Sequence, residues 1–366
     1  MQKTAREIGQ SLFPAPGADE IRRPVESVLD LLDGSPRAPG RPGAESLEEY
    51  ARSAATGDPQ AQYELARLLV SGKPLSIQNR EAVKWLRKAS ARDHAASEAL
   101  LGLLYARGQG VHPNPERAVE LFRTAAIAGN ASAQYHLGIA LENGFGTAKD
   151  ARGALTWYRL AGAQGHVLAQ LRVGKCYAEG LGCRQDAVQA QLWLRRAAAQ
   201  GYPPAELELG LFYSDENSPK GDREAAEKEA FQWIGRAASD GLDEAQYRLA
   251  LLYSIGRGCP PNAEKAISWA RAAASRSHPK ALLFLASCLR HGDGVPRDLA
   301  GALALTLRAH ADTDGQLGRA AMEEIEALAS SRERSEAREI LAGADTVSAL
   351  VASVFLRARA ASREKA

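Results

Sequence analysis

The residues of this chain that could do chemistry are few, and most of them recur at a regular spacing. Three of the seven histidines, His94, His166 and His278, fall at matching places, and the four cysteines do so in two pairs. No two histidines stand four residues apart, the spacing that lets two of them bind zinc from one helix, and the chain contains no G-x-S-x-G, H-E-x-x-H, P-loop or C-x-x-C motif. We therefore expect a protein that is not an enzyme and that uses neither a metal nor a cofactor.

One pattern resembles part of a nucleotide site, a G-x-G pair that occurs five times. A dinucleotide fingerprint needs a preceding strand, a third glycine and a helix N-terminus that points at the pyrophosphate. Here each pair follows a helical pattern instead, so we interpret it as a turn between two helices. The pairs are Gly108 and Gly110, Gly144 and Gly146, Gly180 and Gly182, Gly256 and Gly258, and Gly292 and Gly294.

These spacings follow from an internal repeat of 36 residues, interrupted by one step of 40. A fixed period of this length is typical of solenoid proteins. Each copy is marked by a small residue, which we count as its first place: Ala61, Ser97, Ala133, Ala169, Ala205, Ala245 and Ala281. All five tryptophans share a later place in the repeat, where the series reads Trp85, Leu121, Trp157, Trp193, Trp233, Trp269 and Leu305.

Each repeat carries two amphipathic helical patterns. In the central copy, Ala133, Leu137 and Leu141 lie on one side of the first predicted helix. The second predicted helix contains Trp157 and is followed by Gly165, a residue type suited to the left-handed turn that ends a helix. The sixth place of the repeat is small, and we expect it to make room for the tryptophan ring: the residues are Ala66, Gly102, Gly138, Gly174, Gly210, Ala250 and Ala286.

The repeat resembles the Sel1-like repeat (SLR) family, which is related to the tetratricopeptide repeats. The copy at 245–277 carries the family's positions as Ala245, Leu249, Tyr253, Gly256, Gly258, Ala266, Trp269 and Ala273. The resemblance implies an all-α, right-handed superhelical solenoid of about seven helix-turn-helix repeats, which binds proteins or assembles complexes. It implies no shared chemistry.

The chain is expected to have three parts. Residues 1–44 contain six of the 17 prolines and should form a largely disordered arm. The solenoid should occupy 45–314, beginning with a capping half-repeat at 45–57, and 315–366 should form capping helices and a basic tail. In the fifth repeat, the polar stretch 214–230 lacks the G-x-G pair and should be a solvated loop.

Two amphipathic segments lie outside the repeats. The first, at 21–34, has Val25, Val28, Leu29 and Leu32 on one side. It is either a docking helix for a partner, or a helix that packs on its own solenoid or forms only transiently. The second has Val347, Leu350, Val351, Val354 and Phe355 on one side and is too short to span a bilayer. We favour an end helix folded back on the solenoid over interfacial membrane contact or a partner groove.

The state of the cysteines distinguishes a cytoplasmic protein with free thiols from a secreted protein with disulfides. Some secreted members of the family join the helices of a repeat by a disulfide, and Cys176 with Cys183 resembles such a pair, although the gap is one residue short. Because the N-terminus shows no signal sequence, we expect buried free thiols in a cytoplasmic protein. The alternative is a secreted, disulfide-bonded relative that binds or hydrolyses β-lactams.

The function expected from these features is that of a non-enzymatic scaffold or adaptor, which binds a protein or peptide on its concave face. A net charge of +2 gives no reason to expect nucleic acid as a partner. A third interpretation is a regulator recruited to a membrane surface by the C-terminal helix.

The contact face should lie at the fourth, seventh and eleventh places of the first helices, which vary in chemistry and share one side. The middle of this face is basic, so it suits a partner that presents acidic and apolar side chains. The alternative is that the face binds no partner and is simply solvated. The candidate residues are Leu100, Leu103, His136, Ile139, Arg172, Lys175, Leu211, Arg248 and Leu251.

Overall fold

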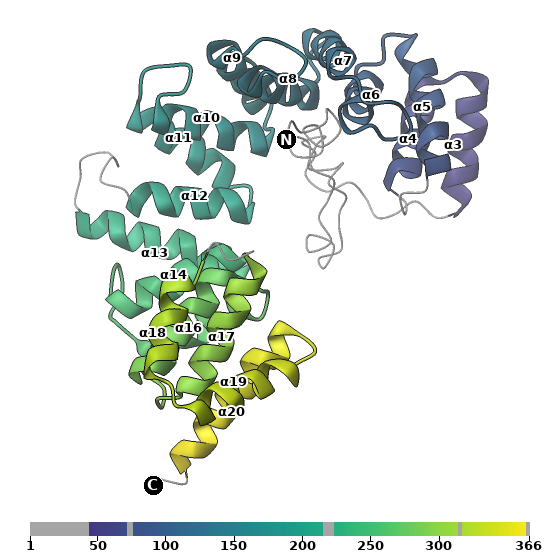
Figure 1. Cartoon of the computed structure of the whole chain (residues 1–366). Helices are drawn as coiled ribbons and strands as arrows, with labels where there is room; N and C mark the ends of the chain where they lie inside the picture. The colour runs from purple at the N-terminus through teal and green to yellow at the C-terminus, as the bar shows by residue number, and fades with distance from the viewer. Residues whose placement is uncertain (1–43, 72–75, 215–222, 314–316, 364–366) are drawn as a thin grey trace. The chain divides into compact units, whose positions relative to one another are not determined.

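The protein is all-α over the residues that its computed structural model describes, namely 44–71, 76–214, 223–313 and 317–363. The predicted arm therefore lies almost wholly outside the described residues. Helices of similar length follow one another and pack in pairs (Figure 1). The seven pairs are α4 (Pro59–Ser71) with α5 (Ser76–Ser90), α6 (Ala95–Arg107) with α7 (Pro115–Ile127), α8 (Ala131–Asn143) with α9 (Ala151–Ala163), α10 (Val167–Glu179) with α11 (Ala187–Ala198), α12 (Pro203–Ser214) with α13 (Arg223–Ser239), α14 (Asp243–Ile255) with α15 (Ala263–Ala274), and α16 (Pro279–His291) with α17 (Leu299–Asp312).

The chain divides into two compact units, one that ends at Gln200 and one that begins at Gly201. In the first unit, α3 (Ala44–Thr56) packs on α4, and α5, α7 and α9 each pack on the first helix of the following repeat. The second unit repeats this arrangement from α12 to α17 and adds α18 (Arg319–Leu328), α19 (Ser331–Ala342) and α20 (Val347–Arg363). Each unit buries apolar cores of its own.

Polar side chains mark where the helices begin. Most second helices start after an Asn or Asp whose side chain accepts a backbone N–H of the first turn, as Asp150 does from Gly153 at 2.9 Å. His166 and His278 do the same for first helices, since their Nδ1 atoms accept the N–H groups of Ala169 and Ala281. The three shared histidines therefore lie in the turns between repeats, and two of them are also helix caps.

The two glycines of each G-x-G pair have different structural tasks. The first ends a helix in the left-handed region, for example Gly144 at φ 73°. The second lies against the backbone that starts the second helix of the preceding repeat: a Cβ on Gly146 would stand 2.2 Å from the carbonyl oxygen of Pro115, and one on Gly182 the same distance from that of Ala151. Both glycines are therefore required by the turn and by the repeat-to-repeat contact.

The prediction that tryptophan fills the small sixth place is wrong. A Cβ on Gly138 would lie 2.4 Å from the ring of Tyr158, the residue after Trp157. Adjacent residues on a helix point about 100° apart, so the tryptophan side chain is directed elsewhere. Trp193 lies against Gly162 of the preceding repeat, and Trp157 is only half-buried.

The insertion in the fifth repeat is partly helical. Residues 215–222 lie outside the described residues, but 223–230, which we expected in a loop, form the start of α13. Their sequence, REAAEKEA, consists of good helix formers. Ion pairs at i, i+4, Arg223 with Glu227 and Lys228 with Glu224, support the added turns.

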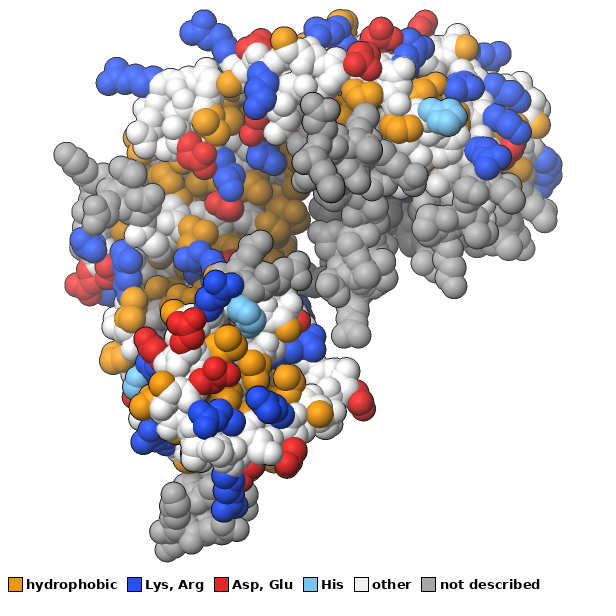
Figure 2. Space-filling view, in the orientation of Figure 1, with side chains coloured by type: hydrophobic (Ala, Val, Ile, Leu, Met, Phe, Trp, Pro, Cys, Tyr) orange, Lys and Arg blue, Asp and Glu red, His pale blue; other side chains and the backbone are white. Residues whose placement is uncertain are grey.

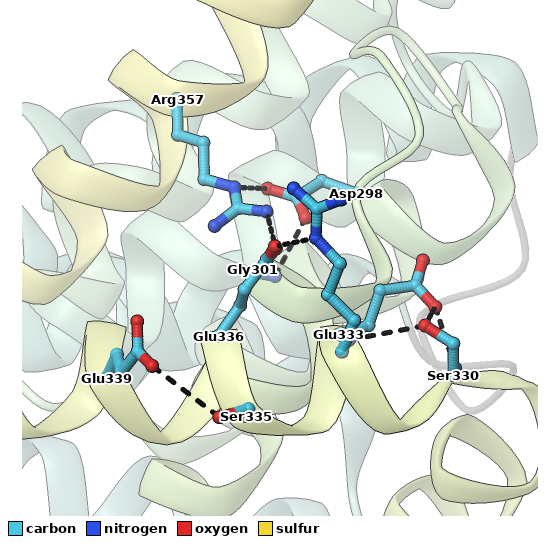
Figure 3. A network of polar contacts seen from close by, with 9 residues as sticks. Asp298, Gly301, Ser330, Glu333, Ser335, Glu336, Glu339 and Arg357 are labelled. Atoms are coloured by element: carbon cyan, nitrogen blue, oxygen red, sulfur yellow. Dashed lines mark hydrogen bonds and ion pairs between the residues drawn. The ribbon is translucent and has the colours of Figure 1, made fainter.

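The C-terminal helix folds back on the solenoid, as we favoured. Helix α20 packs on α15, α17 and α19, and all five residues of its apolar side are buried. Arg357 of α20 reaches Asp298, the N-cap of α17, at 3.6 Å and also pairs with Glu336 of α19 (Figure 3). This side of α20 is consequently covered by protein in the structure, which argues against its use on a membrane. Among the described residues, no helix has both the length and the apolarity needed to cross a bilayer.

The sixth-place glycine can be tested against a matched glycine in the next helix. A Cβ on Gly210 of α12 would lie 2.5 Å from Cγ1 of Ile234, whereas a Cβ on Gly235 of α13 meets no heavy atom within 4 Å. Gly210→Ala should therefore lower the stability by about 1–3 kcal/mol. Gly235→Ala should raise it by about 0.5–1 kcal/mol, because alanine favours the helix. Chemical denaturation followed by circular dichroism measures both, and equal effects of the two changes would contradict the close-packing explanation.

Candidate protein-binding face

The first unit places six of the nine candidate residues on α6, α8 and α10. The four on α6 and α8 are buried rather than open: Leu100, Leu103, His136 and Ile139 have exposed fractions of 5%, 2%, 2% and 5%. Arg172 and Lys175, on α10, are half-buried. The face in this unit therefore has an apolar part on α6 and α8 and a basic part on α10.

In the second unit, the candidate residues Leu211, Arg248 and Leu251 are all half-buried. Arg248 is held in place, since its Nε donates to Oε1 of Glu244 at 2.6 Å. The other oxygen of Glu244 lies 2.9 Å from Nε2 of His278. Because Nδ1 of His278 accepts a backbone N–H, its Nε2 carries the proton and donates to Glu244. These hydrogen bonds from His278 and Arg248 lower the pKa of Glu244 to about 2.

His136 lies among rings and cations in the first unit. Its ring stacks on Phe122 at a centroid distance of 5.4 Å and lies 5.3 Å from Tyr135. Burial lowers its pKa well below the usual range, and the nearby charges of His166 and Arg107 act in the same direction. Burial also lowers the pKa of Arg107 to about 10. At neutral pH His136 is therefore an uncharged part of the face.

A tyrosine–carboxylate pair positions Arg172. The hydroxyl of Tyr158 donates to Oε2 of Glu142 at 2.5 Å, and Nη1 of Arg172 lies 3.5 Å from the other oxygen, Oε1. Burial raises the pKa of Tyr158 strongly, so its phenol stays protonated. The network joins α8, α9 and α10 and directs a guanidinium to the face. These groups hold a positive charge in place; they are not a nucleophile next to a general base.

The glutamine at the second place of the repeat is a structural residue that the sequence analysis did not single out. Its Nε2 donates to a carbonyl oxygen eight residues earlier, at the end of the preceding second helix, in Gln62, Gln134, Gln170 and Gln246. The same carbonyl also accepts the N–H of the glycine in the following turn, so the glutamine gives it a second hydrogen bond and ties the next repeat to this helix end. The signal was present in the sequence, because glutamine directly follows the opening alanine in these four repeats.

The cysteines do not provide an activated nucleophile. All four are free thiols in the structure; Cys176 and Cys288 are buried, whereas Cys183 and Cys259 are only half-buried. Burial raises the pKa of Cys176 to about 12 and that of Cys288 to about 11, which keeps both protonated at neutral pH. Within the described ranges, no three His, Cys, Asp or Glu residues are grouped so that they could hold a metal ion.

Comparisons with known proteins agree with the geometry of the repeats. The sequence model of the Sel1 repeat family matches residues 59–94, 95–130, 131–166, 167–202, 203–242, 243–278 and 279–309. The crystal structure of a Sel1 repeat protein from Oxalobacter formigenes is 29% identical, with a TM-score of 0.60, over 69% of this chain and 96% of that chain.

Two further relatives have names that describe a role. An exopolysaccharide production negative regulator from Rhizobium meliloti is 31% identical over 101 residues, which are 26% of this chain and 38% of the regulator. An immunity protein from Pseudomonas aeruginosa is similar at 20% identity and a TM-score of 0.41, over 59% of this chain and 80% of that chain. This chain thus spans less than half of the regulator's length.

The carboxylate that holds Arg248 predicts a pH dependence of stability. Glu244 has a folded pKa of about 2 against an ordinary value of 4.5, so its contribution is complete above pH 4.5 and is lost as the pH falls toward 2. Glu244→Gln should therefore flatten the fall in melting temperature across this window. Gln60 makes the equivalent contact to His94 at 3.2 Å in the first repeat, so the amide is compatible with the fold. If the melting temperature of the unaltered protein and that of Glu244→Gln fall by the same amount between pH 4.5 and pH 2, the role assigned to Glu244 is wrong.

Proposed function

We propose, because the chain belongs to the Sel1 repeat family, that it is a non-enzymatic scaffold or adaptor that binds a protein or peptide partner. The contact surface in this proposal is formed by the fourth and seventh places of the first helices. The observation that carries it is the placement of Arg172, which Glu142 holds half-buried at the basic end of an apolar face. Polar groups fixed in this way give an interface specificity.

The chemistry of the face indicates the kind of partner. Arg172 and Lys175 on α10 lie next in sequence to the repeat that contributes Ile139. A peptide with acidic groups beside apolar side chains would match both parts of the face. Nucleic acid is a poorer match, because the overall charge is only +2 and side chains of both signs are interspersed on the side of the molecule drawn in Figure 2.

The relatives support a role other than catalysis. The Rhizobium meliloti protein is described as a negative regulator, and the buried thiols of this chain are protonated at neutral pH. We place the protein in the cytoplasm as part of the proposal, because free thiols persist in a reducing compartment. The competing secreted relative requires a disulfide between cysteines such as Cys176 and Cys183.

Counting the free thiols distinguishes the proposed cytoplasmic scaffold from the secreted, disulfide-bonded alternative. The denatured, unreduced protein should react with four equivalents of a thiol reagent, since its four cysteines are free in the structure. Two equivalents or none would favour the secreted, disulfide-bonded alternative.

The proposed face can be tested by removing its charge. Affinity purification followed by mass spectrometry should identify a partner, and Arg172→Gln combined with Lys175→Gln should weaken its binding at least tenfold, about 1.4 kcal/mol. The control is Arg152→Gln combined with Arg159→Gln, which removes the same charge from exposed positions of α9. Calorimetry measures both affinities, and equal losses in the two double variants would contradict a specific face.

A further inference from the structure

The outward side of α9 and α11, in the first unit, gathers exposed apolar side chains. Four of the eight large apolar side chains that are exposed among the described residues fall within 160–192. They are Leu160 on α9, Leu181 in the turn before α11, and Val188 and Leu192 on α11, with exposed fractions of 45%, 42%, 65% and 41%. Single exposed apolar residues are ordinary, but a group of them marks an interaction site.

Helices α9 and α11 also differ in charge from the other second helices. Their sequences, ARGALTWYRLAGA and AVQAQLWLRRAA, contain no acidic residue, whereas the second helix of every other repeat contains at least one Asp or Glu. The carboxylates that precede them, Asp150 and Asp186, accept backbone N–H groups as N-caps. The charged side chains of the two helices are all arginines, and all are exposed: Arg152, Arg159, Arg195 and Arg196.

The two helices are in contact through their neighbouring ends and sides. A Cβ on Gly162 of α9 would stand 3.0 Å from Cζ3 of Trp193 of α11. The turn before α11 lies on the start of α9, since a Cβ on Gly182 would stand 2.2 Å from the carbonyl oxygen of Ala151. The exposed residues of α9 and α11 therefore belong to one continuous region of the first unit.

The exposed residues also occupy matching places in the two repeats. Arg152 matches Val188 and Arg159 matches Arg195, since each pair is one period apart, and all four side chains are exposed. Both helices thus direct these places away from the core. We call this surface the outer face, and it consists of Arg152, Arg159, Leu160, Val188, Leu192, Arg195 and Arg196.

The composition of the outer face favours a lipid surface over a folded protein as its partner. The core of a protein interface is depleted of charge and enriched in aromatic residues. On the outer face arginines alternate with apolar side chains, and neither α9 nor α11 has an exposed aromatic residue. Arginines can lay their aliphatic stems along an apolar layer while the guanidinium groups reach phosphates, and anionic lipids attract basic residues that lie near the membrane surface.

We propose that the outer face binds an anionic lipid surface. Leu160, Val188 and Leu192 enter the boundary between the headgroups and the acyl chains, and the arginines contact the lipid phosphates. The contact is peripheral, because the helices stay packed in their repeats and only side chains insert. It uses none of the residues that we assign to the protein partner, so it does not rest on the proposed function. It also differs from recruitment by α20, whose apolar side is covered.

Sedimentation of the full chain with lipid vesicles tests the proposal. Vesicles of phosphatidylcholine that contain one third phosphatidylglycerol should bind at least tenfold more tightly than vesicles of phosphatidylcholine alone. Raising the ionic strength from about 0.1 M to about 1 M should weaken the binding to the anionic vesicles, because the Debye length falls from about 10 Å to about 3 Å.

Two arginine variants with the same change in net charge locate the contact. Arg152→Gln combined with Arg159→Gln should weaken binding to the anionic vesicles at least tenfold. Arg172→Gln combined with Lys175→Gln is the matched control and should leave vesicle binding unchanged. The same two double variants should have the opposite effects on the protein partner, so a failure of either proposal is seen separately.

The apolar part of the outer face is tested by removing its two exposed residues on α11. Val188→Gln combined with Leu192→Gln should weaken binding to the anionic vesicles at least threefold, because the side chains can no longer enter the acyl boundary. Both residues are exposed and glutamine is a good helix former, so the melting temperature should not change. Circular dichroism checks this for every variant.

Three outcomes would overturn the proposal. The first is equal binding to the anionic and the neutral vesicles, and the second is an equal loss of vesicle binding in the two arginine variants. The third is vesicle binding that does not respond to Val188→Gln with Leu192→Gln and that poly-glutamate or duplex DNA matches, which would mean a general attraction to polyanions. A protein that competes with the vesicles and loses affinity in Arg152→Gln with Arg159→Gln would assign the outer face to that protein instead.

Discussion

The absence of a Cβ at the sixth place of the first helix controls how closely the two helices of a repeat approach. In four repeats this place is glycine, and the residue after the tryptophan position fills the space, as Tyr158 does against Gly138. A side chain there would collide with Phe122, Tyr158, Leu194 or Ile234. Other contacts of the repeat follow from this distance, because it brings the hydroxyl of Tyr158 within reach of Glu142.

Contacts between successive repeats use a second set of small and polar residues. The second glycine of the G-x-G turn meets the backbone of the preceding second helix, and the second-place glutamine donates to a carbonyl at the end of the same helix. Both contacts join neighbours only, so each repeat is stabilised by the repeats beside it. The free energy of unfolding is thereby distributed along each unit rather than concentrated in one core.

The same arrangement explains how a structural repeat can carry a binding face. Titratable groups with large pKa shifts often mark active sites, but here they serve packing: Tyr158 holds Glu142, and His278 holds Glu244. Each carboxylate in turn holds an arginine of the face, Arg172 or Arg248. Interactions within a repeat, and between one repeat and the next, thus fix Arg248 and Arg172 in place. For the partner that we propose, such fixed charges would reduce the entropy that binding must overcome.

The sequence by itself determined the features that depend on neighbours along the chain. The period, the two helices of each repeat, the left-handed turn at Gly144 and the amphipathic side of α20 all follow from local spacing and backbone preference. The tertiary structure alone decided which side chain fills the space at Gly138, since Trp157 and Tyr158 differ by one residue but point in different directions. It also decided that Leu100, Leu103, His136 and Ile139 are buried while Arg172 is half-buried. Variation from repeat to repeat does not distinguish an open face from a covered one, because burial depends on segments that are distant in the sequence.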